Sequence, residues 1–371
     1  MVIQRENRPL RTKGAASVNK YWSELAKGLD PYVPGEQPKD RKYIKLNTNE
    51  NPYGPSPKVL EAIGNCTAEN LKLYPDPTCD TLLTAAAGHY GVQKEQIFAG
   101  NGSDEILAFS YMAFFNPGKA ILFPDITYSF YPVYARLFNI AYRLVNVTEE
   151  FEIPEEELYE SPGGVIIANP NAPTGKFMPL SSIRRILENN TSSVVIVDEA
   201  YVDFGGESAV KLIDEYPNLL VIHTLSKSRS LAGMRLGFAF GNSDLIYAMN
   251  SVKNSFNSYT VDRLAIAAGT AALNDADYFE ATRKKVMDTR KRVSEEMTAM
   301  GFKVVDSAAN FLFAAHPGVQ ASVLFSQLKE KGILVRYFNK PRIDNHLRIT
   351  IGSDAEMDAF LAAAGDILRT G

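Results

Sequence analysis

A lysine, an aspartate and a tyrosine follow predicted strands, and their functional groups suit a carbonyl cofactor. Lys227 comes after the apolar run 219–222, while Asp198 and Tyr201 come after the run 194–197. Most lysines are solvated at the surface, but an amine removed from water can form a Schiff base with a carbonyl compound. A nearby carboxylate can keep a pyridine nitrogen protonated, and a tyrosine can donate to a phenolic oxygen. Pyridoxal phosphate needs the protonated nitrogen in order to accept an electron pair.

Groups that can bind a phosphate occur in the same part of the chain. Ser226 and Arg235 supply a hydroxyl and a fixed cation. Ser103 opens a predicted helix whose N-terminal N–H groups can bind an anion, although for this motif alone a simple helix cap is the better explanation of Ser103. Glu105 occupies the third glycine position of a dinucleotide fingerprint, and the chain contains no Gly-x4-Gly-Lys-Ser/Thr sequence. Each signal is weak alone, but together they indicate a pyridoxal phosphate site.

The elements that must position these groups are alternating strands and helices. Residues 165–168, 194–197 and 219–222 are continuous aliphatic runs of the length of buried strands. Residues 181–187 carry apolar side chains at helical spacing, and Ser181 is the expected N-cap. Such alternation predicts an α/β fold with a mostly parallel central sheet flanked by helices. Ligands of these sheets bind at the carboxyl ends of the strands, where the candidate residues stand.

The pattern changes after about residue 275, which predicts a second, smaller α+β domain. A long charged helix is expected to end at Gly301, and a last helix opens with the capping-box sequence Ser353–Glu356. We expect a large cofactor-binding domain over residues 67–270. Residues 20–66 and 271–371 then form the small domain, and residues 1–19 are an N-terminal extension.

Composition and charge exclude several other classes of protein. The 371 residues include 39 Lys and Arg and 43 Asp and Glu, a formal charge of −4, which argues against nucleic-acid or anionic-membrane partners. Cys66 and Cys79 lack a metal-type spacing, so we expect reduced thiols and no metal. The charged N-terminus lacks a secretory apolar region, and the most apolar stretch, 264–273, is about half the ~20 residues of a membrane span. We therefore expect a soluble, cytoplasmic protein.

The chain resembles the class I/II aminotransferases of fold type I, and most narrowly the histidinol-phosphate aminotransferase family within them. The resemblance extends from about residue 20 to the C-terminus in family order and leaves out the first twenty residues. As a set, its motifs are highly specific for the superfamily and less so for the substrate. These motifs are Pro31–Pro38 (PYVPGEQP), Asn47–Pro52 (NTNENP), Tyr74-Pro75, Gly102–Glu105 (GSDE), Pro124–Tyr128 (PDITY), Asp198–Tyr201 (DEAY), Ser226–Ser228 (SKS), Leu231–Arg235 (LAGMR) and Leu347–Thr350 (LRIT).

The resemblance implies a fold-type I transferase that binds pyridoxal 5'-phosphate. Lys227 would hold the cofactor and shuttle a proton, Asp198 would pair with the pyridine nitrogen, and Tyr201 with the phenolic oxygen. Tyr128 would stack on the ring, although most of the 18 tyrosines are expected in the core. The residues that match the phosphate-binding segments are Ser103, Asp104, Ser226 and Arg235.

The resemblance also implies a homodimer with shared sites and an anionic substrate. Tyr74 matches a tyrosine that reaches the phosphate from the partner subunit. Arg348 and Arg336 match arginines that meet the substrate's anionic group, and Tyr32 and Asn49 lie in segments that match the substrate side. Without the resemblance, a surface ion pair is the simpler interpretation of Arg336.

One position departs from the family pattern. Relatives usually read Asn-Pro-Asn-Asn-Pro-Thr-Gly, and the last of these asparagines contacts the phenolic oxygen. This chain has Ala172 there. Losing a hydrogen bond to a charged group costs about 1.5–3 kcal/mol, which other anchors can tolerate. We expect either that the contact is lost or that Asn171 replaces it.

The function that the resemblance implies is amino-group exchange between L-histidinol phosphate and 2-oxoglutarate, a reaction of histidine biosynthesis. Two alternatives keep the same cofactor and Lys227: an aromatic-amino-acid aminotransferase and a decarboxylase of an amino-acid phosphate. A third, of another class, is a non-catalytic α/β protein that binds a phosphorylated ligand at the Ser103 helix end. That alternative leaves the order of Asp198, Lys227 and Arg235 as an accident.

Overall fold

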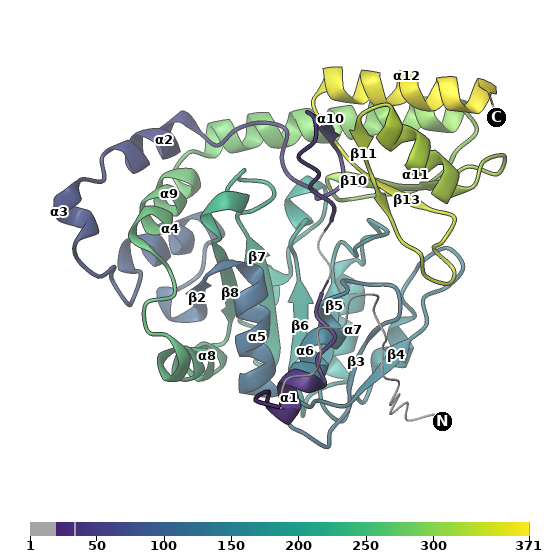
Figure 1. Cartoon of the computed structure of the whole chain (residues 1–371). Helices are drawn as coiled ribbons and strands as arrows, with labels where there is room; N and C mark the ends of the chain where they lie inside the picture. Colours follow the sequence, from purple (N-terminus) through teal and green to yellow (C-terminus); the bar gives the residue numbers. More distant parts are fainter. Residues whose placement is uncertain (1–19, 33–34, 371) are drawn as a thin grey trace.

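A seven-stranded sheet forms the centre of the computed structural model, which describes residues 20–32 and 35–370 (Figure 1). Neighbouring strands pair in parallel except β8, which is antiparallel to both β2 and β7. In sheet order the strands are β2 (Ile97–Gly100), β8 (Gly237–Gly241), β7 (Leu219–Thr224), β6 (Val195–Asp198), β5 (Val165–Ala168), β3 (Ile121–Pro124) and β4 (Tyr142–Val145). The expected extension, 1–19, and Val33 and Pro34 of the PYVPGEQP motif lie outside the described residues.

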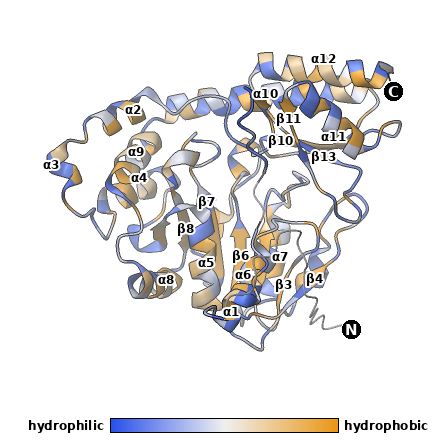
Figure 2. Ribbon diagram, viewed as in Figure 1, coloured by the Kyte–Doolittle hydropathy of each residue, from blue (hydrophilic) through white to orange (hydrophobic). Residues whose placement is uncertain are grey.

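The three apolar runs of the sequence form β5, β6 and β7 at the middle of this sheet, and Figure 2 shows β6 in the orange of hydrophobic residues. Their side chains alternate between two apolar cores. Val165 and Ile167 of β5 face one core, while Ile166 and Ala168 face the other. A strand that is covered on both faces has no solvated side, which explains why these runs are continuous rather than alternating.

Helices cover both faces of the sheet. The first core packs against α2 (Pro57–Gly64), α4 (Asp80–Tyr90), α7 (Leu180–Glu188) and α9 (Arg263–Leu273). The second packs against α5 (Gly102–Phe114), α6 (Tyr131–Leu137) and α8 (Ser243–Phe256). The short helices are α1 (Glu24–Lys27), α3 (Ala68–Leu71) and the 3-10 turns η1 (Lys94–Gln96), η2 (Glu155–Leu158), η3 (Val202–Phe204), η4 (Ala209–Leu212) and η5 (Ala232–Met234).

The C-terminal part of the chain forms a separate antiparallel sheet beneath long helices (Figure 1). Its strands in order are β12 (Arg336–Tyr337), β13 (Leu347–Thr350), β10 (Phe311–Ala315) and β9 (Lys303–Val305). The helices are α10 (Ala276–Ala299), α11 (Ala321–Glu330) and α12 (Asp354–Thr370), and they share one apolar core with this sheet. The N-terminal strand β1 (Ile44–Lys45) pairs in parallel with β11 (Ile333–Leu334) beside it.

Helix ends follow the sequence signals with two exceptions. Ser103 is not a helix cap, because α5 begins at Gly102 and its N-cap is Asn101. Ser353 and Glu356 form the expected capping box at the start of α12. The expected cap at Ser181 is wrong: α7 begins one residue earlier, and the carbonyl of Pro179 accepts from the N–H groups of Ser182 and Ile183. The fixed φ of proline suits the residue that precedes a first turn.

Two further findings concern the whole of the described chain. Within residues 20–32 and 35–370, no helix has the length and apolar character that crossing a membrane requires. Cys66 and Cys79 are both free thiols.

Candidate active site

A cavity of about 260 Å³ opens at the carboxyl edge of the central sheet. It lies where β6 and β7 end, between the central sheet and strands β12 and β13. Every site residue predicted from the sequence lines it except Tyr74 and Asn171. These lining residues are Tyr32, Asn49, Ser103, Asp104, Tyr128, Asp198, Tyr201, Ser226, Lys227, Arg235, Arg336 and Arg348.

Lys227 lies on the turn that follows β7, three residues after the strand ends. Its Nζ donates a hydrogen bond to the carbonyl of Thr48 at 3.2 Å and lies 5.8 Å from the centre of the Tyr201 ring. The side chain is half-buried, and no carboxylate forms an ion pair with it among the described residues. An amine in this position faces the cavity without a neutralising partner.

Asp198 ends β6 and is almost fully buried. Its Oδ2 accepts from the hydroxyl of Tyr131 at 2.9 Å, whereas its Oδ1 has no hydrogen-bond partner in the part of the chain that the structure describes. Burial raises the pKa of Asp198 to about 6, although the Tyr131 hydrogen bond acts in the opposite direction. A buried acceptor of this kind is complete only when a charged N–H group enters the cavity.

Tyr201 projects into the cavity and is held there by Asn49. The hydroxyl of Tyr201 accepts from Asn49 Nδ2 at 3.0 Å, which leaves its own proton for another acceptor. Asn49 is held in turn by Thr350, whose hydroxyl donates to its Oδ1, and by Asn310, which donates to its carbonyl. Both hydrogen-bonding ends of the Asn49 amide are therefore occupied, and its contact with the cavity is mainly through Tyr201.

Ser103, Ser226 and Arg235 surround one end of the cavity. Arg235 Nη2 pairs with Asp104 at 3.2 Å, and its Nη1 reaches the Ser226 hydroxyl at 3.5 Å. Gly102, at the start of α5, has φ +80°, and a Cβ added there would lie 2.6 Å from Arg235 Nη2. Only glycine leaves room for the guanidinium beside the N-terminus of α5, so this end of the cavity is built for an anion.

Two aromatic rings form the wall between the ends of the cavity. The hydroxyl of Tyr128 donates to Asp104 at 2.9 Å, and burial, with Asp104 next, raises the Tyr128 pKa well above its usual value. Tyr32 stacks on Phe130 with their ring centres 4.4 Å apart. Both rings are fixed by their neighbours, which leaves flat apolar surface facing the cavity.

Arg348 and Arg336 occupy the other end, opposite each other on β13 and β12. Arg348 Nη2 donates to the carbonyl of Asn47 at 2.9 Å, while its Nε is buried without a hydrogen-bond partner among the described residues. The Arg348 guanidinium lies 5.4 Å and 5.6 Å from the ring centres of Phe311 and Phe338. Burial lowers its pKa. Two guanidinium groups opposed on neighbouring strands can bind one anion together.

Two predicted residues do not line the cavity. Asn171 is buried, its Nδ2 donates to the carbonyl of Ile126 at 2.8 Å, and its Oδ1 accepts from Thr127. Both ends of the Asn171 amide are therefore bonded to residues 126 and 127. Ala172 lines the cavity and packs beside Tyr201. Tyr74 lies elsewhere, 77% exposed and stacked on Tyr259.

Sequence reasoning missed Tyr131 and Thr224. Tyr131 is the donor to Asp198, and Thr224 lines the cavity and donates to the hydroxyl of Ser226 at 2.9 Å. Thr224 stands at the end of β7, so its place after an apolar run was a usable signal. Tyr131 begins α6 in a run of aromatic residues, and nothing local separates it from core tyrosines.

The order of the central sheet and the lysine at its carboxyl edge define a fold-type I enzyme that depends on pyridoxal 5'-phosphate. The model of the family "Aminotransferase class I and II" matches residues 41–363, and the chain belongs to this family. It is 57% identical over 344 residues to the histidinol-phosphate aminotransferase of Clostridium beijerinckii, covering 93% of this chain and 96% of that protein. The enzyme of the same name from Clostridium acetobutylicum is also 57% identical, covering 93% and 98%.

A solved structure shows the same architecture. The histidinol-phosphate aminotransferase from Sinorhizobium meliloti, in complex with pyridoxal-5'-phosphate, matches with a TM-score of 0.86 at 25% identity, covering 95% of this chain and 99% of that one. These findings confirm the predicted fold class, the aminotransferase activity and the cofactor.

Proposed function

We propose that this aminotransferase exchanges an amino group between L-histidinol phosphate and 2-oxoglutarate, as a step of histidine biosynthesis. The observation that carries the substrate assignment is the opposed pair Arg336 and Arg348 at the end of the cavity. Guanidinium groups stay charged and bind phosphate through parallel hydrogen bonds. The names of the relatives at 57% identity support the same substrate.

The residues of the cavity fit pyridoxal 5'-phosphate. The unpaired Oδ1 of Asp198 would accept the proton of the pyridine nitrogen, and the remaining proton of Tyr201 would reach the phenolic oxygen. Ser103, Ser226 and Arg235 would bind the phosphate, and the Tyr128 ring would cover the pyridine. When bound, the cofactor supplies a conjugated ring that takes up the electron pair of the broken C–H bond.

The side chains of this chain supply the proton transfers and the orientation. Lys227 would hold the cofactor and, once displaced by the substrate amine, its Nζ would remove and return the proton at the substrate carbon. Asp198 must remain ionised to keep the pyridine nitrogen protonated, and the Tyr131 hydroxyl stabilises that ionised form. Arg348, fixed by the carbonyl of Asn47, would orient the substrate by its anionic group.

Two measurements test this function. Borohydride reduction followed by peptide mass mapping should place the cofactor on Lys227, and purified enzyme should convert imidazole-acetol phosphate in a glutamate-dependent reaction. Faster glutamate-dependent turnover of phenylpyruvate would favour an aromatic aminotransferase instead. Release of carbon dioxide without amino transfer would favour a decarboxylase. A colourless protein whose function survives Lys227→Ala would overturn the enzyme assignment itself.

We also propose that the enzyme is a homodimer, on the basis of exposed apolar side chains at and beyond Tyr74. Leu71, Leu73 and Tyr74 are each more than half exposed, as are Tyr247 and Phe256 of α8. Exposed apolar groups of this number commonly mark an interface with a second chain. Tyr74 would then reach the cofactor phosphate in the other subunit's site.

Subunit mixing tests the shared site. Lys227→Ala and Tyr74→Ala should each be impaired, and mixed dimers should regain activity because one of their two sites carries neither substitution. A chain that sediments as a monomer, or mixed dimers that regain nothing, would rule out shared sites.

Two further assignments are part of the same proposal. We divide the chain into a large domain over residues 67–270 and a small domain over residues 20–66 and 271–371. The strand pair β1 and β11 joins these two separate segments of the small domain and supports the division, whereas α2 of the first segment packs against the core of the large domain. We place the enzyme in the cytoplasm, which suits its two free thiols.

A further inference from the structure

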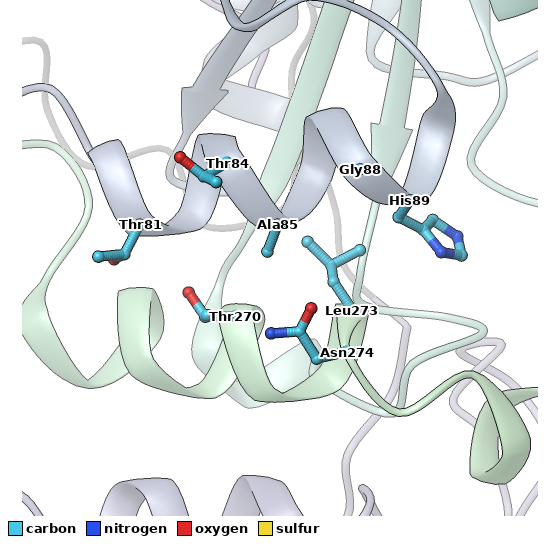
Figure 3. Close-up of a pocket in the computed structure, with 8 residues that line it drawn as sticks. All are labelled: Thr81, Thr84, Ala85, Gly88, His89, Thr270, Leu273 and Asn274. Carbon is cyan, nitrogen blue, oxygen red and sulfur yellow. The ribbon is translucent and has the colours of Figure 1, made fainter.

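A second depression lies away from the cavity, between the neighbouring helices α4 and α9 (Figure 3). It is lined by Thr81, Thr84, Ala85, Gly88, His89, Thr270, Leu273 and Asn274, none of which lines the active-site cavity. His89 stands in the last turn of α4, at one end of this groove. Its imidazole connects the groove with the catalytic lysine.

The connection runs through Arg229, which is almost fully buried two residues after Lys227. Arg229 Nη2 donates to His89 Nε2 at 2.9 Å, and its Nη1 donates to the carbonyl of Ala272 at 2.6 Å. That carbonyl belongs to the last turn of α9, where a cation is favourable because of the helix dipole. The guanidinium also lies 3.6 Å from the centre of the Phe279 ring. The side chain of Arg229 is thus held by contacts with α4, α9 and α10.

The contact with Arg229 fixes the protonation state of His89. Because a guanidinium only donates, His89 Nε2 must present its lone pair, so the imidazole is neutral. Burial, with the charge of Arg229 next, lowers the pKa of His89 to about 4. The pair therefore persists throughout the physiological pH range.

The turn that carries Lys227 has anchors on two sides. On one side, Asn51 Nδ2 donates to the carbonyls of Lys227 and Ser228 at 3.1 Å and 3.3 Å, and Ser228 donates to Asp203. On the other side, Arg229 is the anchor. Since the turn ends at Ser230 in the left-handed region with φ +59°, its backbone is strained and needs both anchors to keep one conformation.

We propose that Arg229 and His89 are positioning residues for Lys227. The His89–Arg229 contact fixes the position of the turn that carries the lysine relative to α4, α9 and Phe279. This inference rests on the proposed role of Lys227 as the cofactor lysine. Neither residue touches the cavity, so their effect is exerted through the turn. A displacement of the amine by about 1 Å is enough to lower turnover substantially.

The test compares four variants of the holoenzyme. His89→Leu removes the acceptor, whereas His89→Gln places an amide oxygen near the position of Nε2 and should restore the contact. Arg229→Lys keeps the charge but replaces the two nitrogens that bond Ala272 and His89 by a single nitrogen on a differently shaped side chain, so we expect it to lose the geometry of this double contact. Thr81→Ala, in the same groove without contact to Arg229, is the matched control.

The main readout is the pH titration of the visible absorbance of the bound cofactor, which reports the charges around the Lys227 nitrogen. We expect His89→Leu and Arg229→Lys to shift its midpoint by about 0.5 pH unit or more. We also expect kcat to fall about tenfold with little change in KM. His89→Gln and Thr81→Ala should titrate as wild type.

The outcomes separate this inference from the proposed function. If borohydride reduction fails to label Lys227 in the wild type, the cofactor assignment fails. If the wild type is labelled and both disrupting variants titrate unchanged, the positioning role is wrong. The role is also wrong if His89→Gln behaves as His89→Leu does. Should His89→Leu not fold, Arg229→Lys decides the test.

Discussion

Replacing Tyr131 with phenylalanine should make the stability of the cofactor-free protein more sensitive to pH. The hydroxyl of this buried residue donates to Asp198 Oδ2 at 2.9 Å, and Asp198 Oδ1 has no partner among the described residues. Phenylalanine keeps the ring and its packing, so the substitution removes little besides one hydrogen bond to a titratable group. The size of the effect then depends on whether the carboxyl is charged.

The magnitude follows from the pKa of Asp198, about 6 in the folded protein because of burial, against about 3.9 in an unfolded chain. The folded state therefore binds the proton more tightly, and the free energy of unfolding falls as pH rises from about 4 to about 6, by roughly 3 kcal/mol. The hydrogen bond is worth about 1.5–3 kcal/mol to the ionised carboxyl and about 0.5–1.5 kcal/mol to the neutral one. This difference of about 1–1.5 kcal/mol means that losing the bond extends the decline upward by roughly 1 pH unit.

The assay is urea unfolding of cofactor-free wild type and Tyr131→Phe at pH 5 and pH 8.5. We expect the variant to lose about 0.5–1.5 kcal/mol at the lower pH, where the carboxyl is neutral, and about 1.5–3 kcal/mol at the higher. Tyr111→Phe is the matched control, because this buried hydroxyl donates to the carbonyl of Tyr131, which does not titrate. An equal loss at both pH values for Tyr131→Phe would refute the reasoning.

Three further substitutions have definite expected results. Lys227→Ala should abolish borohydride labelling and amino transfer while leaving thermal unfolding nearly unchanged, because the one hydrogen bond that its side chain makes among the described residues is to the carbonyl of Thr48. Gly102→Ala should weaken cofactor binding in a fluorescence titration, since φ +80° costs about 1–2 kcal/mol for alanine and the new Cβ crowds Arg235. Arg348→Met should raise KM for histidinol phosphate about 10- to 150-fold, the equivalent of about 1.5–3 kcal/mol, and change KM for histidinol much less. Equal effects on both substrates would remove Arg348 from the phosphate site.

The sequence predicted the parts of the fold whose signals are local. The runs that form β5, β6 and β7 are apolar because both faces of the sheet are covered, and the side chains that follow them meet because parallel strands end at one edge. Lys227 and Asp198 could be found for that reason. Ser226 and Arg235 flank the same turn, and Ser103 stands at a helix start, so these could be found as well.

Contacts that depend on tertiary packing could not be predicted in the same way. Tyr131 meets Asp198 from α6, across 67 residues of chain, and Arg229 meets His89 across 140. Asn49 was expected on the substrate side; it lines the cavity, and its amide is bonded to Thr350 and Tyr201, contacts that its sequence motif does not indicate. Residue type and spacing indicate which chemistry is possible, whereas hydrogen-bond partners depend on which elements pack together.

Ala172, where the family resemblance predicts an asparagine, makes apolar contacts in this structure. The methyl group joins Tyr201 and Phe311 in a small apolar cluster beside the cavity. Asn171 is held by Ile126 and Thr127, so its amide is not available as a replacement donor. The proton of the Tyr201 hydroxyl is consequently the donor left for a phenolic oxygen on this side of the cavity.

The single antiparallel strand, β8, has a consequence for how specificity can change. Because β7 and β8 pair at Thr224 and Gly237, and Leu225 bonds to Leu236, residues 225–236 form one loop closed at its base. Lys227 and Arg235 belong to that loop, so their spacing is fixed by it, whereas Arg348 lies on a different sheet. Changing β12 and β13 to suit another substrate would therefore leave the spacing between Lys227 and Arg235 intact. The proposed substrate-binding strands can be redesigned without changing the loop proposed to bind the cofactor.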